Sequence, residues 1–320
     1  MNRYTRQMIL PEVGAGGQAR LSKARVLVVG GGGLAAPVLP LLAGAGVGHL
    51  TILDADEVAL SNLHRQTLFT EADCGRPKAE VAADRSRSLN SDIDVVACKR
   101  ALTNENAAGF VSQADVILDC ADSYAASYTL SDICLTLGKP LISASVLGLS
   151  GYVGAFCGGA PSLRAVFPDA PTSGASCATA GVLGPVVGMI GAMQAQMALA
   201  LILDLDPSPL GQMVQVDAHT FRSSSFRFDA APEPEQSFAF VAASQLSSDD
   251  VIVELRDEDE APQPIHPLAR RLSVEHLKSD PNKAKRLALC CATGLRAWRA
   301  AEQIEPDWPG EIVLVAAATS

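Results

Sequence analysis

The sequence predicts an α/β protein built on a doubly wound, mostly parallel β-sheet with an antiparallel extension, followed by a smaller α/β domain. Two observations support this prediction. Short apolar runs alternate with stretches of about ten or more residues that have helical apolar spacing, which is typical of parallel sheets covered by helices. The first apolar run, 26–29, is β-branched and aliphatic without polar alternation, as in strands buried on both faces.

A glycine turn follows this first strand directly. It contains Gly30, Gly32 and Gly33, and residues 34–45 then have helical apolar spacing. This order of strand, turn and helix is Rossmann-like. Its glycines allow backbone N–H groups and the helix N-terminus to approach phosphate oxygens closely. Turns of this kind serve NAD, FAD, SAM and ATP alike, so the turn predicts a nucleotide site without choosing the nucleotide.

The remaining elements of the large sheet continue the alternation. An amphipathic segment, 4–21, precedes the first strand. After the first helix we expect, in order, a strand at 49–53, a helix at 77–90, and strands at 94–99, at 116–119 and from 140. Glycine-rich strands around 152–156, a long apolar helix at 180–203 and a closing hairpin (214–217 with 221–228) complete the domain.

A change of composition marks the end of this domain. Residues 229–237 are rich in proline and glutamate, as in linkers. We therefore expect a nucleotide-binding domain at 1–228, a linker at 229–243 and a small domain at 244–320. Strands at 251–255, 286–290 and 312–316 and a helix at 297–304 belong to the small domain, with Trp298 and Trp308 in its core.

The bulk properties exclude several classes of protein. With 48% hydrophobic residues in 320 positions, the chain can bury a sizeable core. The net charge of −10 argues against nucleic acid as the main partner. We expect no membrane segment, because the most apolar stretch is interrupted by Pro185 and by glycines, and we expect no signal peptide. The eight cysteines form no CxxC pair, which favours reduced thiols in the cytoplasm.

Charged residues near the strand ends favour ATP over NAD. Asp54 ends the second strand at the carboxyl edge of the sheet, where it can accept hydrogen bonds from a ribose. Arg65 and Lys78 add two cations, which suit a triphosphate better than the pyrophosphate of a dinucleotide. Asp122, just after the fourth strand, is placed to hold Mg²⁺ against those phosphates.

Six motifs in order give a specific resemblance. The chain resembles the MoeB/ThiF/HesA adenylyltransferases, the bacterial relatives of ubiquitin-activating enzymes, from about Arg3 to Phe228. The motifs are Arg3-Tyr-Thr-Arg-Gln7, Gly30-Gly-Gly-Gly-Leu34, Asp54-Ala-Asp56, Asn62-Leu-His-Arg-Gln66, Gly75-Arg-Pro-Lys78 and Asp119-Cys-Ala-Asp122.

This resemblance implies an activity and roles for residues. The family uses Mg·ATP to adenylate the C-terminal Gly-Gly carboxylate of a small ubiquitin-like sulfur carrier protein, releasing pyrophosphate. It implies a homodimer, in which Arg6 reaches the γ-phosphate of the other subunit's ATP. In this chain the nucleotide would contact Gly30, Gly32, Gly33, Asp54, Asp56, Asn62, Arg65, Gln66, Lys78 and Asp122, with Asp54 on the ribose, Arg65 and Lys78 on the phosphates and Asp122 on the metal.

The chain departs from the family at several positions. Many relatives bind a structural zinc through two CxxC pairs, and here the first pair's positions are Ser162 and Ala165, while the second would fall near 229–237, which has no cysteine. We therefore expect no zinc. Ser123 and Ser127 replace an asparagine and an arginine that are usual after Asp122, which puts the contacts with the metal and the carrier tail in question.

Two cysteines are candidates for sulfur chemistry. Cys177 precedes the long apolar helix, and the matching cysteine in relatives is a candidate for acyl transfer or for a disulfide with the carrier; the alternative is a buried small residue. Cys291 opens a CxxGxR sequence between an apolar strand and a helix, which resembles the active-site loop of rhodanese-like domains. The alternative for Cys291 is a degenerate domain kept for packing or dimerisation.

Three functions follow from these observations. The first is a cytoplasmic, homodimeric adenylyltransferase that activates a sulfur carrier of the ThiS/MoaD type. Its Cys291 would deliver sulfur obtained from a donor such as a cysteine desulfurase, for thiamine, molybdopterin or thiolation pathways. The second is a catalytically weakened nucleotide-binding scaffold or regulator of such a pathway. The third, an NAD-dependent dehydrogenase, rests only on the glycine turn and Asp54.

Overall fold

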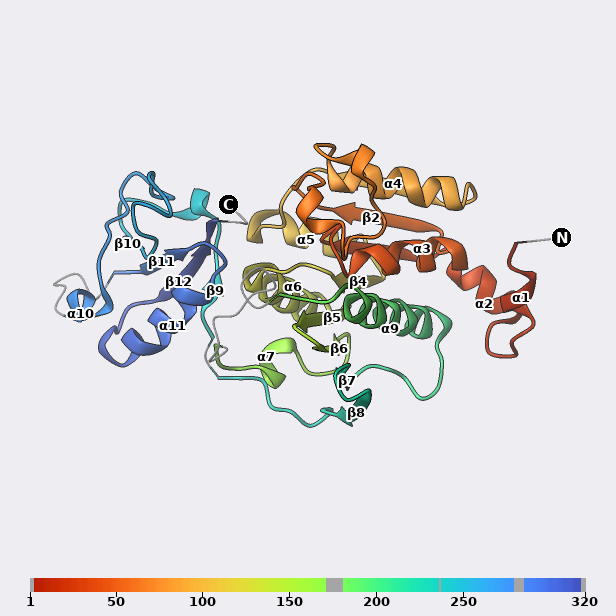
Figure 1. Ribbon diagram of the computed structural model, residues 1–320. Coiled ribbons are helices and arrows are strands. Elements are labelled where there is room, and N and C mark those ends of the chain that lie inside the picture. The colour runs from red at the N-terminus through yellow and green to blue at the C-terminus, as the bar shows by residue number, and fades with distance from the viewer. Residues whose placement is uncertain (1–2, 171–180, 236, 279–284, 318–320) are drawn as a thin grey trace.

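The computed structural model describes residues 3–170, 181–235, 237–278 and 285–317. Figure 1 shows a large sheet covered by helices on both faces, with a smaller α/β unit at one end and the N-terminal helices at the other. The α/β class expected from the sequence is confirmed. The turns that carry the expected site residues follow the carboxyl ends of the central strands.

The large sheet has eight strands in the order β3-β2-β1-β4-β5-β6-β7-β8. Its first five members pair in parallel, and β5 to β8 pair antiparallel, which is the extension expected from the sequence. The strands are β1 (Arg25–Val29), β2 (His49–Leu53), β3 (Asp94–Cys98), β4 (Val116–Asp119), β5 (Pro140–Leu147), β6 (Ser150–Cys157), β7 (Gln212–Asp217) and β8 (Arg222–Arg227).

Helices cover both faces of this sheet (Figure 1). The helices of the large unit are α1 (Thr5–Met8), α2 (Gly14–Leu21), α3 (Ala35–Ala45), α4 (Lys78–Leu89), α5 (Asn104–Ser112), α6 (Tyr124–Leu137), α7 (Leu163–Val166) and α9 (Gly184–Leu203), of which α1 and α2 lie at one end. In β1, Val26 and Val28 pack with α3, α4 and α9, whereas Leu27 and Val29 pack with α5 and α6. The strand is therefore buried on both faces, as its sequence predicts.

The small unit contains a parallel sheet of four strands in the order β10-β11-β12-β9. The strands are β9 (Ala239–Phe240), β10 (Val251–Glu254), β11 (Leu287–Cys291) and β12 (Ile312–Ala316), and the helices are α10 (Val274–Leu277) and α11 (Leu295–Ile304). Trp298 and Trp308 are 2% and 3% exposed, so both belong to the core. β9 lies within the segment expected as the linker and pairs with β12.

The long apolar helix α9 is a core helix. It is the one described helix that is long and apolar enough to span a membrane, and 61% of its most apolar window is buried inside the fold. It packs against α3, β5 and β6. Its buried Gln194 donates to the carbonyl oxygens of Asp119 and Ile142 at 2.7 and 3.0 Å, which ties the helix to β4 and β5.

Candidate functional site

The glycine turn lies between the carboxyl ends of β2 and β4. Gly30 has φ +91°, and a Cβ there would lie 2.6 Å from the carbonyl oxygen of Cys120. Its N–H donates to the Leu53 carbonyl at 2.8 Å. No side chain caps the first turn of α3, which begins after the turn. Only glycine fits the first position, and α3 presents uncapped backbone N–H groups to an anion.

Two carboxylates follow β2 at this edge. Asp54 accepts hydrogen bonds from the N–H of Gly31 at 2.6 Å and of Asp56 at 2.7 Å, and its burial raises the pKa of its carboxyl group. Asp56 is exposed, and it pairs with the Lys78 ammonium at 2.8 Å. Lys78 is the first residue of α4, and its side chain is only 6% exposed. The structure therefore brings Asp54, Asp56 and Lys78 to the glycine turn.

The segment from 60 to 66 forms the other side of the turn. The Arg65 guanidinium donates to the Asn62 side-chain oxygen at 2.9 Å. Gln66 is 4% exposed, and its side-chain oxygen is buried without a hydrogen-bond partner among the described residues. Its amide nitrogen lies 3.4 Å from the position of a Cβ on Gly32, and Arg65 Cγ lies 3.6 Å from that of a Cβ on Gly33. Buried polar atoms are normally hydrogen-bonded, so this unpaired oxygen beside the glycine turn fits a site where a bound ligand donates the missing hydrogen bond.

The end of β4 supplies the carboxylate expected to serve the metal. Asp122 is exposed, while Asp119, three residues earlier, is fully buried. Asp119 accepts from the Ser143 hydroxyl at 2.7 Å and from the Ala121 N–H at 3.2 Å, and burial raises its pKa to about 6. Asp119 thus holds the turn that carries Asp122. Asp119 opens one of the six sequence motifs, but its supporting role could not be predicted, because its partners Ser143 and Gln194 are distant in sequence.

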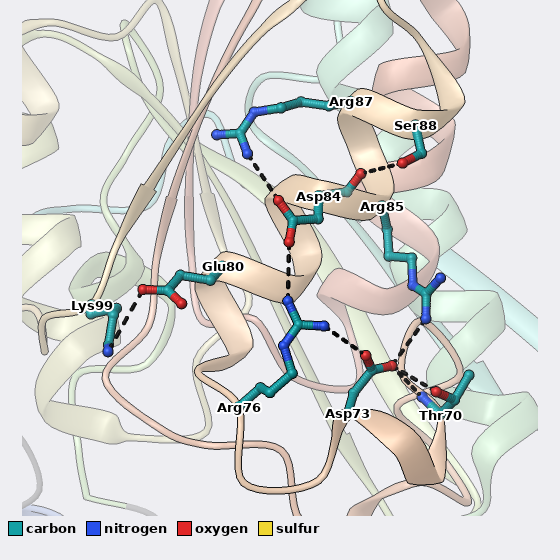
Figure 2. Close-up of polar contacts among 9 residues, drawn as sticks. All are labelled: Thr70, Asp73, Arg76, Glu80, Asp84, Arg85, Arg87, Ser88 and Lys99. Carbon is teal, nitrogen blue, oxygen red and sulfur yellow. Dashed lines mark hydrogen bonds and ion pairs between the residues drawn. The ribbon is translucent and has the colours of Figure 1, made fainter.

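A network of ion pairs fixes the segment that leads to Lys78 (Figure 2). The Asp73 carboxylate, 5% exposed, accepts from Arg76 and Arg85 at 3.0 Å each and from both the N–H and the hydroxyl of Thr70. Arg76 also pairs with Asp84 on α4 at 3.1 Å. These bonds tie residues 70–76 to α4, so they set the position of the first residue of that helix.

The Asp73 network predicts a pH-dependent contribution to stability. Hydrogen bonds from Thr70 hold the pKa of Asp73 at about 2, below its usual 3.8. Its stabilising effect is therefore complete above pH 4 and is lost as the pH falls through 2. We expect Asp73→Asn to lower the free energy of unfolding by about 1–3 kcal/mol at pH 7.

Urea denaturation of wild type and variant between pH 7 and 2.5 tests this, and the difference should narrow below pH 4. The exposed neighbour gives a matched control, because Asp84→Asn should change stability by less than about 0.5 kcal/mol. A difference between wild type and Asp73→Asn that stays constant down to pH 2.5 contradicts the assignment.

Two expected site residues are not brought to the glycine turn. Arg6 is exposed on α1, which contacts the C-terminal end of α3 through Tyr4 and Gly46, whereas the glycine turn precedes the other end. Because α3 has 11 residues, about 16 Å of helix separates the two ends. A role for Arg6 in catalysis thus still requires a second subunit and stays a prediction. Cys177 lies outside the described residues.

The Cys291 loop forms a cradle of backbone N–H groups around the sulfur atom. Cys291 is the last residue of β11, and its Sγ accepts hydrogen bonds from the N–H groups of Gly294 at 3.1 Å and Ala297 at 3.4 Å. Gly294 is the N-cap of α11 with φ +94°. Arg296 pairs with Glu260 and donates to the Leu255 carbonyl. Two N–H groups at the start of α11 therefore point at one sulfur atom.

The two segments that correspond to the zinc-binding segments of relatives are joined here by a hydrogen-bonded pair. Ser162 donates from its N–H at 2.7 Å and from its hydroxyl at 2.5 Å to the carboxylate of Glu233. The two segments that hold CxxC pairs in relatives are therefore joined in this chain by a serine and a glutamate. Across the described residues, no three His, Cys, Asp or Glu side chains are placed to hold a metal ion.

Comparisons with known proteins agree on the first three quarters of the chain. Residues 4–238 match the ThiF family. The "Adenylyltransferase and sulfurtransferase MOCS3" of Culex quinquefasciatus is 44% identical over 228 residues, covering 70% of this chain and 51% of that protein. The protein of the same name from Sus scrofa is 43% identical over 219 residues, covering 68% and 48%. The chain thus spans about half the length of these curated relatives.

Solved structures share the fold. The crystal structure of E. coli MccB with ATP has a TM-score of 0.63 and 23% sequence identity, covering 72% of this chain and 73% of that one. A second MccB structure, with MccA-N7isoASN, has a TM-score of 0.64 at the same identity. The fold class expected from the sequence is therefore confirmed by structure as well as by family.

Proposed function

This chain belongs to the ThiF family, and we propose that it uses ATP to adenylate the C-terminal Gly-Gly carboxylate of a ubiquitin-like sulfur carrier protein, and that Cys291 then takes part in sulfur transfer. The observation that carries the proposal is the convergence of Lys78, Asp54 and Gln66 on the glycine turn at the end of β1. The names of the curated relatives, which join adenylyltransferase and sulfurtransferase, support both halves of it.

The adenylation step requires charge neutralisation and alignment. A carrier carboxylate oxygen attacks the α-phosphorus, the bond from that phosphorus to the bridging oxygen breaks, and pyrophosphate leaves. Lys78 and Arg65 would neutralise the phosphates, the N–H groups at the start of α3 would bind phosphate oxygens, and Asp54 would accept from the ribose. Such a step needs no general acid or base, because positioned cations stabilise the developing charge.

The nucleotide would enter by displacing bonds that the chain now makes to itself. Asp54 binds the Gly31 N–H, and Asp56 binds Lys78, so phosphate oxygens would take the place of carboxylate oxygens on the same donors. Asp122 fits a hard cation such as Mg²⁺, since it is an exposed oxygen donor at this edge. When bound there, Mg²⁺ would supply further neutralisation of the phosphates.

Sulfur transfer would use the Cys291 cradle. A persulfide on Cys291 attacks the carbonyl carbon of the carrier adenylate, the carbon–oxygen bond to AMP breaks, and an acyl disulfide forms. A thiol reductant then releases the carrier thiocarboxylate. The N–H groups of Gly294 and Ala297 support the proposal, because they would stabilise the sulfur anion. The sulfur would come from a protein persulfide donor such as a cysteine desulfurase.

The wider setting belongs to the same proposal. We expect a cytoplasmic homodimer in which Arg6 completes the partner subunit's ATP site. The carrier would serve thiamine, molybdopterin or thiolation pathways. Zinc is not required by this account, because the segments that hold zinc ligands in relatives carry Ser162 and Glu233, which bind each other.

The first test is ATP–pyrophosphate exchange with purified Gly-Gly-ended carriers, Mg²⁺ and the full chain. Exchange that depends on the carrier is the expected result. Nucleotide binding by calorimetry without exchange would instead favour the second candidate, a scaffold or regulator, which the change to Ser123 and Ser127 after Asp122 suggests. Binding of NADH without binding of ATP would favour the third candidate, an NAD-dependent dehydrogenase.

A further inference from the structure

The Cys291 loop lies against the helix that begins beside Asp122. A Cβ on Gly294, inside the loop, would lie 3.6 Å from the Cβ of Ala125 and 2.5 Å from the ring of Phe240. Ala125 is in the first turn of α6, which starts two residues after Asp122. The thiol loop of the small unit and the turn that carries the expected metal ligand are therefore neighbours within one chain.

A buried edge-to-face aromatic pair holds the small unit against α6. Tyr128 on α6 and Trp298 on α11 meet edge to face with ring centroids 4.5 Å apart. The Arg164 guanidinium lies 4.9 Å from the Tyr128 ring and 5.8 Å from the Trp298 ring, and it is paired with Asp132 at 2.6 Å. Aromatic pairs of this geometry contribute about 0.5–1.5 kcal/mol beyond the area they bury. The small unit is thus docked on α6 by defined contacts.

Bonds between side chains and backbone groups extend the same contact on both sides of this aromatic pair. Arg164 donates to the Phe238 carbonyl, just before β9, at 3.1 Å. Glu302, one turn along α11 from Trp298, accepts from the N–H of Ala170 at 2.7 Å. Helix α7 and the loop after it are therefore tied to the small unit on each side of Tyr128 and Trp298, which fixes the orientation of the Cys291 loop.

The docked loop is both close to the adenylation site and shielded from solvent. Cys291 is 1% exposed. Following the contacts from Sγ through Gly294 and Ala125 places the sulfur within about 22 Å of the Asp122 Cα, a span that an extended tail of roughly seven residues covers. A flexible carrier tail adenylated in this chain is therefore within reach of the same chain's thiol.

We propose that Cys291 receives the carrier adenylate made in its own chain, and that docking of the small unit on the first turn of α6 sets this pairing. The inference rests on the proposed function and adds which active site the thiol serves. Because Cys291 is buried in the docked arrangement, the loading of its sulfur and the attack on the adenylate both take place when the contact with α6 opens, and the contact returns the thiol to the same chain's site between turnovers.

Paired variants test the pairing directly. One chain carries Lys78→Ala and the other Cys291→Ser. The two are co-expressed with different affinity tags and purified through both, or mixed in equal amounts if no doubly tagged species forms. Thiocarboxylate formation on the carrier is then measured with ATP, a persulfide donor and a thiol reductant. Transfer within one chain predicts no more product from the pair than from either variant alone.

Product at a quarter or more of the wild-type rate would overturn the proposal, because it requires transfer between chains. Failure of the proposed function is distinguishable, since the wild-type chain would then make no carrier adenylate at all.

Alkylation of Cys291 tests the docking contact without any activity. Ala125→Leu adds bulk at the contact, and we expect iodoacetamide to label Cys291 at least about tenfold faster in this variant, measured by peptide mass spectrometry. Cys290, buried on the other face of β11, is the internal reference and should not change. Thr136→Leu, at the exposed end of α6, is the matched control. Equal Cys291 rates in wild type and Ala125→Leu, or a parallel rise at Cys290, would count against the contact.

Discussion

Lys78→Ala is expected to lower carrier-dependent ATP–pyrophosphate exchange by roughly 10²–10³-fold, the size of the loss when one preorganised charge is removed from a transition state. The Lys78 ammonium is held 2.8 Å from Asp56 by a side chain that is 94% buried, so its position is fixed before the nucleotide arrives. Alanine leaves Asp56 exposed to water, and the loss should therefore fall on the reaction more than on folding.

The measurement is initial-rate exchange with labelled pyrophosphate at saturating ATP, with unfolding followed on the same samples. Lys99→Ala is the matched control: Lys99 is also near α4, but its side chain is half exposed and its ammonium pairs with Glu80 at 3.6 Å. We expect exchange by the control to stay within about twofold of wild type, as is usual for exposed pairs. Equal losses of exchange activity in the two variants would show that Lys78 does not act at a phosphate site.

Cys291→Ser is expected to reduce formation of the carrier thiocarboxylate to background. A serine oxygen has the size to fit the cradle of Gly294 and Ala297 N–H groups, but it cannot carry a transferable sulfur. Exchange of pyrophosphate in the same preparation reports on the adenylation half separately. The product is detected by intact mass of the carrier after incubation with ATP, a persulfide donor and a thiol reductant.

The neighbouring cysteine provides the control for this second prediction. Cys290 packs on the other face of β11, in a core with Ile252 and Val313, and it is buried like Cys291. Cys290→Ala should keep most of the sulfur transfer. If Cys291→Ser retains transfer while Cys290→Ala loses it, the small unit acts through a different thiol from the one proposed.

Local sequence patterns predicted most of the fold. The β1 run, the glycine turn and the strand ends at Asp54 and Asp119 depend on short-range periodicity, so the order of strands and helices followed from the chain alone. Strand β9 could not be predicted in the same way, because a strand of two residues shows no alternation of apolar and polar side chains. Its place beside β12 depends on the packing of Phe240 in a core that the small unit shares with one face of the large sheet.

The site residues that belong to sequence motifs were predictable, whereas the contacts that hold them in place through residues distant in sequence were not. Lys78, Asp54 and Gln66 were expected from their motifs and do meet at the glycine turn. The Ser143 bond that supports Asp119 and the Ser162–Glu233 pair join residues far apart in the sequence, so no local pattern indicated them. The docking of Cys291 on α6 likewise depends on the contact between Tyr128 and Trp298, and the sequence predicted only that Trp298 lies in a core.

Activation of a Gly-Gly carboxylate with ATP is the reaction on which every other proposed step depends. The most direct measurement is the intact mass of a ubiquitin-like carrier after incubation with the full chain, ATP and Mg²⁺, beside the same carrier lacking its two terminal glycines. The account predicts an AMP adduct on the first carrier and none on the second. No adduct on any of several Gly-Gly-ended carriers, or equal adducts on both forms, would contradict it.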